Sequence, residues 1–119
     1  STVFVFNGLL AGVRTPTPVP GRIGAQKIAH LVAENLGHGS LSWTLNWLQE
    51  YLNAHSRGVP ALNIGLCDGE ELAVFSQYEK YPGYYNLQAS LGDGYRAIAS
   101  QPLSGWPFSP LKPGIVHRF

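Results

Sequence analysis

The spacing of hydrophobic positions changes several times along the chain, and each change predicts a different element. Residues 1–6 alternate and are rich in β-branched and aromatic side chains, which predicts a strand. Asn7 and Gly8 follow this segment, and the pair is typical of a sharp turn. Residues 13–22 contain three alternating prolines, so an extended loop is expected there.

Two amphipathic helices are predicted next. In the first, apolar residues recur at spacings of three and four before Gly37 ends the helix. These residues are Ala25, Ile28, Ala29, Val32 and Leu36. In the second helix, Ser40 is a candidate N-cap and four leucines form a stripe that should be buried. The stripe consists of Leu41, Leu45, Leu48 and Leu52. We interpret Trp43, Trp47 and Tyr51 as packing or surface residues of this helix.

The rest of the chain has strand-like patterns separated by turn signals. The predicted strands are residues 61–66, 71–78, 84–90, 95–100 and 114–119. Residues 67–70, Cys-Asp-Gly-Glu, predict a hairpin turn, in which Glu70 and Glu71 are expected to be solvated. Short connections favour antiparallel neighbours. The predicted class is therefore α+β, with a mainly antiparallel sheet and two consecutive helices, and the proline-rich residues 102–113 should wrap an edge of the sheet.

Composition limits the function. The 119 residues suffice for one domain, residues 1–119, and a hydrophobic content of 45% predicts a folded core. Charged residues are only 13% of the chain, so part of the surface is expected to face a partner. The net charge is +1 and the basic residues are evenly spread, which argues against a nucleic-acid interface.

Other features concern location and cofactors. No apolar run approaches the ~20 residues that cross a bilayer, and no leader is visible. Cys67 is the single cysteine, which excludes an internal disulfide, and the histidines lack metal-site spacing. We therefore expect a cytoplasmic protein without membrane contact, metal or cofactor. The chain has no methionine, so it has either lost its initiator or been cut from a longer chain.

Four short segments of the sequence are informative when they are considered together, in their order along the chain. They are FVFNG (4–8), GRIGAQ (21–26), LNIGLCDG (62–69) and IASQPL (98–103), the last followed by Trp106 and residues 112–114, Lys-Pro-Gly. Their order and spacing resemble the class II glutamine amidotransferases, N-terminal-nucleophile hydrolases with a four-layer αββα fold. The first segment looks like that family's aromatic-x-His-Asn-Gly strand. The others resemble its Gly-x-Thr-Asp-Ser-Glu, Leu-Asn-Phe-x-x-x-Asp-Gly and Ala-Ser-Glu-Pro-Leu segments. The resemblance covers residues 3–119, but only the latter part of the family domain, and the missing part should be about as long again.

The resemblance implies roles for two catalytic residues. Asn7 would give its side-chain amide, and Gly8 its backbone N–H, to an oxyanion hole. The alternative is an ordinary turn. Phe6 replaces the family's histidine, which changes the rim of the site but not the hole. In the family the nucleophile is the thiol of the first residue of the mature chain, so a partner chain would have to supply the N-terminal half and its cysteine. The substrate would be glutamine or a related amide.

The start of the first helix departs from the family pattern. Gly24 stands where the family has the aspartate that holds the substrate's α-ammonium. The lost pairing costs roughly 2–5 kcal/mol, so glutamine is not expected to be recognised in the usual manner. Arg22 and Gly24 at a helix start could favour an anion instead, and a plain helix entrance is the other interpretation.

Three functions stay open. In the first, this chain is a subunit or fragment that contributes oxyanion-hole and pocket residues to an amide-hydrolysing site completed by another chain, and it is inactive alone. In the second, it is a non-catalytic structural or regulatory subunit of a larger enzyme complex. In the third, it is a hydrolase that uses Ser1 as nucleophile. Cys67 is interpreted as a structural or incidental cysteine.

Overall fold

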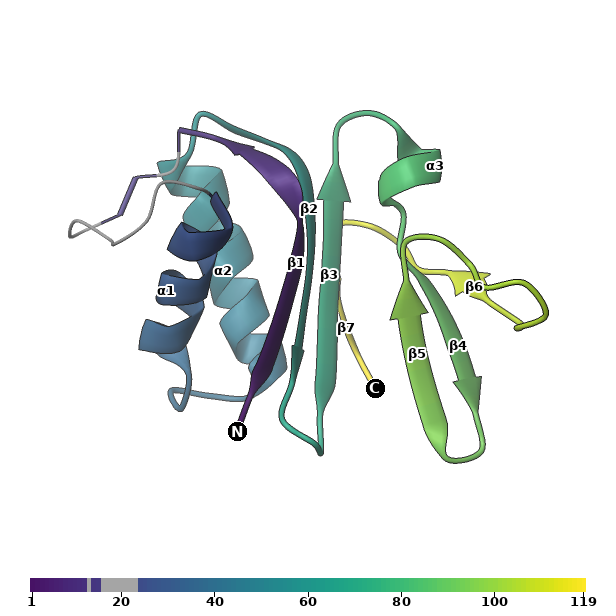
Figure 1. Cartoon of the computed structure of the whole chain (residues 1–119). Helices are drawn as coiled ribbons and strands as arrows, with labels where there is room; N and C mark the ends of the chain where they lie inside the picture. The colour runs from purple at the N-terminus through teal and green to yellow at the C-terminus, as the bar shows by residue number, and fades with distance from the viewer. Residues whose placement is uncertain (13, 16–23) are drawn as a thin grey trace.

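The computed structural model describes residues 1–12, 14–15 and 24–119. Most of the loop expected over residues 13–22, including Arg22, lies outside them. In chain order the elements are β1 (Val3–Ala11), α1 (Gly24–Asn35), α2 (Leu41–His55), β2 (Gly58–Cys67), β3 (Leu72–Tyr78), α3 (Pro82–Tyr85), β4 (Gln88–Gly92), β5 (Tyr95–Ala99), β6 (Ser109–Pro110) and β7 (Val116–Arg118) (Figure 1). The predicted α+β class is confirmed.

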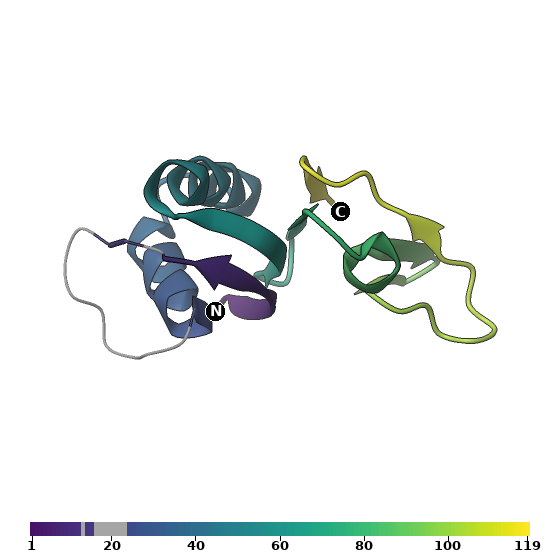
Figure 2. The same ribbon diagram turned by 90° about the horizontal axis from the view of Figure 1, so that it is seen from above.

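The strands form two antiparallel sheets. The first sheet has the order β1-β2-β3-β7, and the second has the order β5-β4-β6. Helices α1 and α2 lie on one side of the first sheet, and the second sheet lies on the other side (Figure 2). This succession of helices, sheet and sheet corresponds to three layers of the αββα arrangement that the sequence resemblance implies.

The core lies between the two helices and the first sheet. The predicted leucine stripe of α2 is buried, with Leu45, Leu48 and Leu52 each 1% exposed. The same cluster includes Ile28, Leu31 and Val32 of α1 and Leu62, Ile64, Leu66 and Phe75 of the sheet. The helix ends are also as predicted. Ser40 Oγ accepts a hydrogen bond from the Trp43 backbone at 3.1 Å, and Gly37 has a positive φ of 89° after α1.

The predicted hairpin joins β2 to β3. Asp68 Oδ1 accepts hydrogen bonds from the backbone N–H groups of Glu70 and Glu71, at 2.9 and 2.8 Å. Gly69 has a φ of 95°, which a residue with a side chain rarely adopts. These contacts fix the turn, and Cys67 is therefore paired with Leu72 across the two strands.

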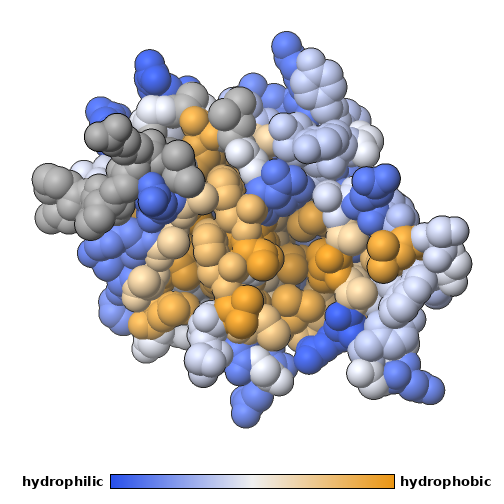
Figure 3. All heavy atoms as spheres, in the orientation of Figure 1, coloured by the Kyte–Doolittle hydropathy of each residue, from blue (hydrophilic) through white to orange (hydrophobic). Residues whose placement is uncertain are grey.

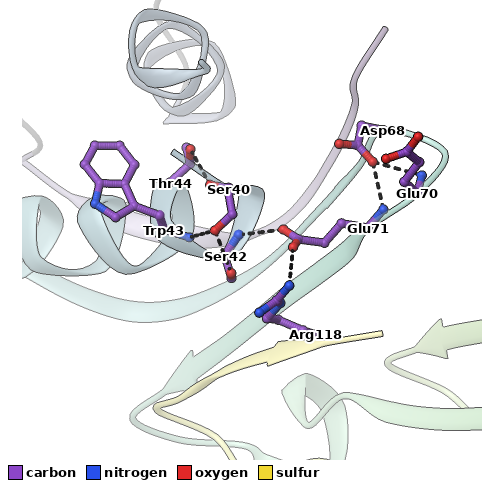
Figure 4. A network of polar contacts seen from close by, with 8 residues as sticks. All are labelled: Ser40, Ser42, Trp43, Thr44, Asp68, Glu70, Glu71 and Arg118. Carbon is purple, nitrogen blue, oxygen red and sulfur yellow. Dashed lines mark hydrogen bonds and ion pairs between the residues drawn. The ribbon is translucent and has the colours of Figure 1, made fainter. Parts of the chain in front are cut away.

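Glu71 is not solvated, and the prediction for this residue is wrong. Its side chain is 16% exposed and forms an ion pair with Arg118 Nη2 at 3.0 Å. Glu71 Oε1 also accepts a hydrogen bond from the Ser42 backbone at 2.9 Å. Figure 4 shows Glu71 between the first turn of α2 and Arg118 of β7. A carboxylate at this position satisfies a free N–H group at the helix start and interacts favourably with the helix dipole.

One predicted strand needs correction, and one predicted edge segment agrees with the structure. A strand was expected over residues 84–90, but Pro82–Tyr85 form the short helix α3 and β4 begins only at Gln88. Proline favours the first turn of a helix because its φ is already fixed there. The segment 102–113 contains β6, which pairs with β4 at an edge of the second sheet, as expected.

Asn7 and Gly8 do not form a turn. Strand β1 continues through them to Ala11, and Asn7 and Gly8 pair with Asn63 and Leu62 of β2. A Cβ atom at Gly8 would collide with the carbonyl oxygen of Ala61. Glycine is therefore required here because two backbones approach closely, and not because the chain reverses.

Candidate functional site

A cleft of about 570 Å³ lies between the two sheets. From the first sheet it is lined by Val3, Val5, Asn7, Asn63, Gly65, Cys67 and Val74, and from β5 by Arg96, Ala97, Ile98 and Ala99. In Figure 3 hydrophobic atoms gather in a hollowed area at the centre of the molecule. The walls are mostly apolar with a few polar groups, which is the usual character of a small-molecule site.

Strand alternation decides which side chains reach the cleft. Successive side chains of a strand point to opposite faces of the sheet. Phe4 and Phe6 of β1 pack against the core beneath the helices. Val3, Val5 and Asn7 line the cleft, which Phe6 also borders. The partners of these three residues on β2 are Cys67, Gly65 and Asn63. One face of β1 and β2 therefore presents two asparagines beside a row of small and apolar residues.

Asn7 is an exposed residue at this cleft, and it is the predicted catalytic side chain that the structure places there. Gly8 follows it within β1, against Ala61, and does not line the cleft. An oxyanion hole requires donors about 2.7–3.1 Å from the developing negative charge. The side-chain amide of Asn7 can provide one such donor, and the role of Gly8 stays a prediction.

The structure does not bring Gly24, one of the two predicted substrate-binding residues, to the cleft that Asn7 lines. Gly24 begins α1, and a Cβ atom there would lie 3.6 Å from Cδ1 of Leu10, which packs against the core. Gly24 is not among the residues that line the cleft. Arg22 lies outside the described residues, so its role in substrate binding stays a prediction.

Asn63 is a polar residue of the cleft to which the sequence resemblance assigned no role. Its side chain is buried, with the residue 5% exposed. Nδ2 donates a hydrogen bond of 2.7 Å to the carbonyl oxygen of Tyr85. Oδ1 makes no hydrogen bond with any residue that the structure describes. The signal in the sequence was an isolated asparagine within an otherwise apolar strand, ALNIGL (61–66), where asparagine is disfavoured.

Three other polar residues line the cleft, namely Cys67, Arg96 and Ser100. Cys67 is partly buried and free, on the same face of β2 as Asn63 but four residues further along. Four strand residues span about 13 Å, so the Cys67 thiol belongs to the other end of the cleft. Arg96 of β5 contributes a positive charge to the opposite wall. The sequence placed Cys67 only in the hairpin turn and did not predict that it faces a cleft.

The described residues contain neither a candidate metal site nor a candidate membrane-spanning helix. The described part of the chain contains no group of three or more His, Cys, Asp or Glu residues placed to hold a metal ion. Among the same residues, no helix combines the length and the apolar character needed to cross a lipid bilayer.

Comparison with known proteins identifies the class of fold. No family model matches the sequence, and no significant match is found among curated proteins. Among solved structures, the chain is similar to a glutamine aminotransferase class-II domain protein from Silicibacter pomeroyi, with a TM-score of 0.62 and 19% sequence identity. The match covers 98% of this chain and 62% of that protein, so the chain spans about three fifths of its structural neighbour. At this identity the likeness shows the fold, which is that of a class II glutamine amidotransferase domain, as the sequence resemblance implied.

Proposed function

We propose that this chain forms part of an amide-hydrolysing site of the glutamine amidotransferase kind, completed by another polypeptide. The observation that carries the proposal is the position of Asn7. It belongs to the Asn-Gly pair that resembles the family's oxyanion hole, and it lies in the cleft between the two sheets of the shared fold. The substrate would be glutamine or a related primary amide.

The chemistry assigns a defined task to this chain. A thiolate attacks the amide carbon, and the carbonyl electrons move to the oxygen. The Asn7 amide, together with the Gly8 N–H, stabilises that oxyanion. The base that took the proton from the thiol gives it to the nitrogen, and as the oxyanion collapses the C–N bond breaks and the nitrogen leaves as ammonia. Water then hydrolyses the thioester, which releases the acid and restores the thiol.

The nucleophile is best supplied from outside this chain. Ser1 lies beyond Val3, at the far end of β1, and Val3 itself is four strand residues, or about 13 Å, from Asn7. Cys67 is cross-strand partner to Val3 and lies equally far away. A group that attacks a carbonyl must come within about 3–3.5 Å of it. This distance favours a partner's cysteine over Ser1.

The first sheet offers a surface for that partner. β1 is an edge strand, so one side of its backbone is open to pairing. On its cleft face Val3 and Val5 are 62% and 61% exposed. An added polypeptide could extend the sheet and cover these valines, in a permanent interface expected to bury above ~2,000 Å² in total. A cytoplasmic setting, with the free thiol of Cys67, fits this assignment.

A non-catalytic subunit is the second candidate, because of Gly24. The carboxylate of the family is missing at the start of α1, where a Cβ atom added to Gly24 would be in ordinary contact with the Leu10 side chain. A domain that no longer binds glutamine could retain the fold as a structural or regulatory part of a larger enzyme. The two candidates differ in whether the assembled protein releases ammonia.

The test is to purify the native assembly and to identify every chain by mass spectrometry and N-terminal sequencing. The proposal expects a second chain that begins with cysteine, and ammonia release from glutamine or a related amide by the assembly. This chain alone should release none. A stable, monodisperse monomer of 12.9 kDa without a partner would overturn the proposal. An assembly that releases no ammonia from any amide would favour the structural role.

A further inference from the structure

The two edges of the first sheet differ in how well they are protected against pairing with a further strand. Strand β1 forms one edge and has nine residues, none of which is charged or proline. Strand β7 forms the other edge, has three residues and includes His117 and Arg118. Short edge strands, charged side chains and prolines discourage pairing with another chain. The unprotected edge of this sheet is therefore β1.

Both walls of the cleft expose apolar side chains. Val3 and Val5 of β1 are 62% and 61% exposed, and both line the cleft. On the opposite wall Arg96 of β5 lines the cleft, and its cross-strand partner on β4 is Leu91, which is 56% exposed. Residues paired across antiparallel strands lie on the same face of the sheet. A further element between the two walls would bury apolar surface from both sheets.

Arg96 restricts the chemistry of whatever covers the cleft. Among the described residues that line the cleft, Arg96 alone carries a charge. It is exposed, and it forms no ion pair with any carboxylate that the structure describes. A polypeptide over the cleft would remove water from this guanidinium group, and burial of an unpaired charge is costly. The covering segment therefore needs a carboxylate, which arginine binds through two parallel hydrogen bonds.

Two hairpins determine where Arg96 lies along the cleft. Cys67 is the last residue of β2 before the turn to β3, and Arg96 is the second residue of β5 after the turn from β4. Both turns lie at the same end of the molecule, which is also the end at which β1 begins (Figure 1). Arg96 thus lies toward Val3, whereas Asn7 is four strand residues, or about 13 Å, beyond Val3. The charge belongs to the end of the cleft that is remote from the proposed chemistry.

We infer that an extended segment of the partner polypeptide pairs with the open edge of β1, covers Val3 and Val5 with apolar side chains and places an aspartate or glutamate opposite Arg96. This inference rests on the proposed function for the existence of the partner and adds how the partner is recognised. In strand addition of this kind, backbone hydrogen bonds supply affinity and the alternating side chains supply specificity. The fold has room for such a segment, because the match covers 62% of the structural neighbour and the rest of that protein has no counterpart in this chain.

Two other occupants fit the cleft less well. A second copy of this chain could pair through its own β1, but that strand contains no carboxylate for Arg96. A small carboxylic acid could bind Arg96, but it would leave the backbone of β1 unpaired and the two valines exposed. A partner strand that carries a carboxylate satisfies the open edge, the apolar walls and the charge together.

The first experiment locates the carboxylate in the purified assembly, with variants of this chain co-expressed with every chain that co-purifies. Arg96→Lys retains the charge and supplies a primary amine, which a carbodiimide joins to a carboxylate in direct contact. We expect the new lysine to be coupled to an aspartate or glutamate of the partner, identified by mass spectrometry of the cross-linked peptides. Arg118→Lys is the matched control, because Arg118 contacts Glu71 within this chain at 3.0 Å. Its lysine should be coupled to Glu71.

The second experiment measures the affinity of the partner for surface variants of this chain. Arg96→Glu should weaken the assembly about tenfold to a hundredfold, because two carboxylates would then face each other. Val5→Lys should weaken it as well, since a lysine on an edge strand opposes pairing. Ile115→Lys is the control, because Ile115 is 47% exposed but does not line the cleft, and it should leave the affinity unchanged. In the unaltered assembly, the backbone amides of residues 3–9 should exchange slowly with deuterium.

The inference is overturned if the lysine of Arg96→Lys is coupled to no partner residue while the control lysine is coupled to Glu71. Rapid amide exchange over residues 3–9 in the assembly, equal weakening by Val5→Lys and Ile115→Lys, or a partner that is only a second copy of this chain would also contradict it. An assembly that passes these tests but releases no ammonia supports the docking mode and contradicts the catalytic proposal. Ammonia release by an assembly whose partner binds elsewhere does the reverse.

Discussion

The backbones of Gly8 on β1 and Ala61 on β2 approach each other so closely that a Cβ atom at Gly8 would collide with the Ala61 carbonyl oxygen. Ala61 is buried within the central part of the first sheet, so the neighbouring backbone cannot move aside without disturbing the pairing of Asn7 with Asn63. The position of the Asn-Gly pair thus depends on a glycine that the sheet requires.

Replacing Gly8 by alanine should therefore destabilise the fold. Insertion of a methyl group into a closely packed region costs about 1–3 kcal/mol, and we expect a loss of this size in the free energy of unfolding in urea. Gly83→Ala is the matched control, since a Cβ there meets nothing within 4 Å, and it should change stability by less than about 1 kcal/mol. Equal effects of the two substitutions would show that the close approach at Gly8 is not restrictive.

Glu71 should matter more for stability than its ion-pair partner. Glu71→Ala removes the acceptor for the Ser42 N–H as well as the pair with Arg118, and loss of such a helix-start contact costs about 0.5–2 kcal/mol. The Arg118 side chain is 67% exposed, so Arg118→Ala should cost less than about 1 kcal/mol. Chemical denaturation of both variants measures their free energies of unfolding. A larger loss of stability in Arg118→Ala than in Glu71→Ala would contradict the prediction.

Asp68 gives a defined dependence on pH. The backbone N–H groups of Glu71 and Glu70 hold the pKa of the Asp68 carboxyl below its usual range. Its folded pKa is thus below the unfolded one, so its contribution to stability is complete above the unfolded value. The contribution is lost as the pH falls through the folded value. Asp68→Ala should lower the melting temperature at neutral pH, and the difference from the unaltered protein should shrink below about pH 4.

The control for that series is Glu70→Ala. The Glu70 backbone, and not its carboxylate, contacts Asp68, so this variant should keep a nearly constant small difference across the same pH range. If the difference in melting temperature between Asp68→Ala and the unaltered protein widens as the pH falls, the stabilising role assigned to the Asp68 carboxylate is contradicted.

Gly24 tests whether the start of α1 takes part in substrate binding. The space beside Leu10 accepts a side chain, so Gly24→Asp should fold. In the assembled complex it should improve glutamine binding about tenfold to a hundredfold if the new carboxylate reaches the α-ammonium. Calorimetry measures the affinity, and Gly24→Asn is the uncharged control. If the two variants bind glutamine with the same affinity, the start of α1 does not contact the substrate.

Elements whose sequence pattern is local and strong were predicted correctly. The leucine stripe of α2, its Ser40 cap and the Asp-Gly hairpin after β2 each depend on neighbours within a few residues, and the structure confirms them. The resemblance also indicated the correct fold.

Most of the errors arose where contacts distant in sequence decide the structure. Asn7-Gly8 has the local signal of a turn, but pairing with β2 extends the strand through it. Glu71 was expected to be solvated because its partners are not its neighbours in the sequence. Ser42 and Arg118 lie 29 and 47 residues away and contact Glu71 only in the folded chain. Asn63 was visible as an isolated polar residue, yet its opposition to Asn7 follows from strand register, which the sequence pattern did not give.

The most direct test of the central claim is the rate of amide hydrolysis by the assembled complex when Asn7 is replaced by alanine. Loss of one oxyanion donor lowers turnover by about 10²–10³, and we expect this fall in kcat with a smaller change in KM. Asn46→Ala, at an exposed position of α2 on the helix side of the first sheet, should leave both unchanged. If Asn7→Ala hydrolyses the amide at the same rate as the unaltered complex, Asn7 stabilises no oxyanion and the non-catalytic role replaces the one proposed.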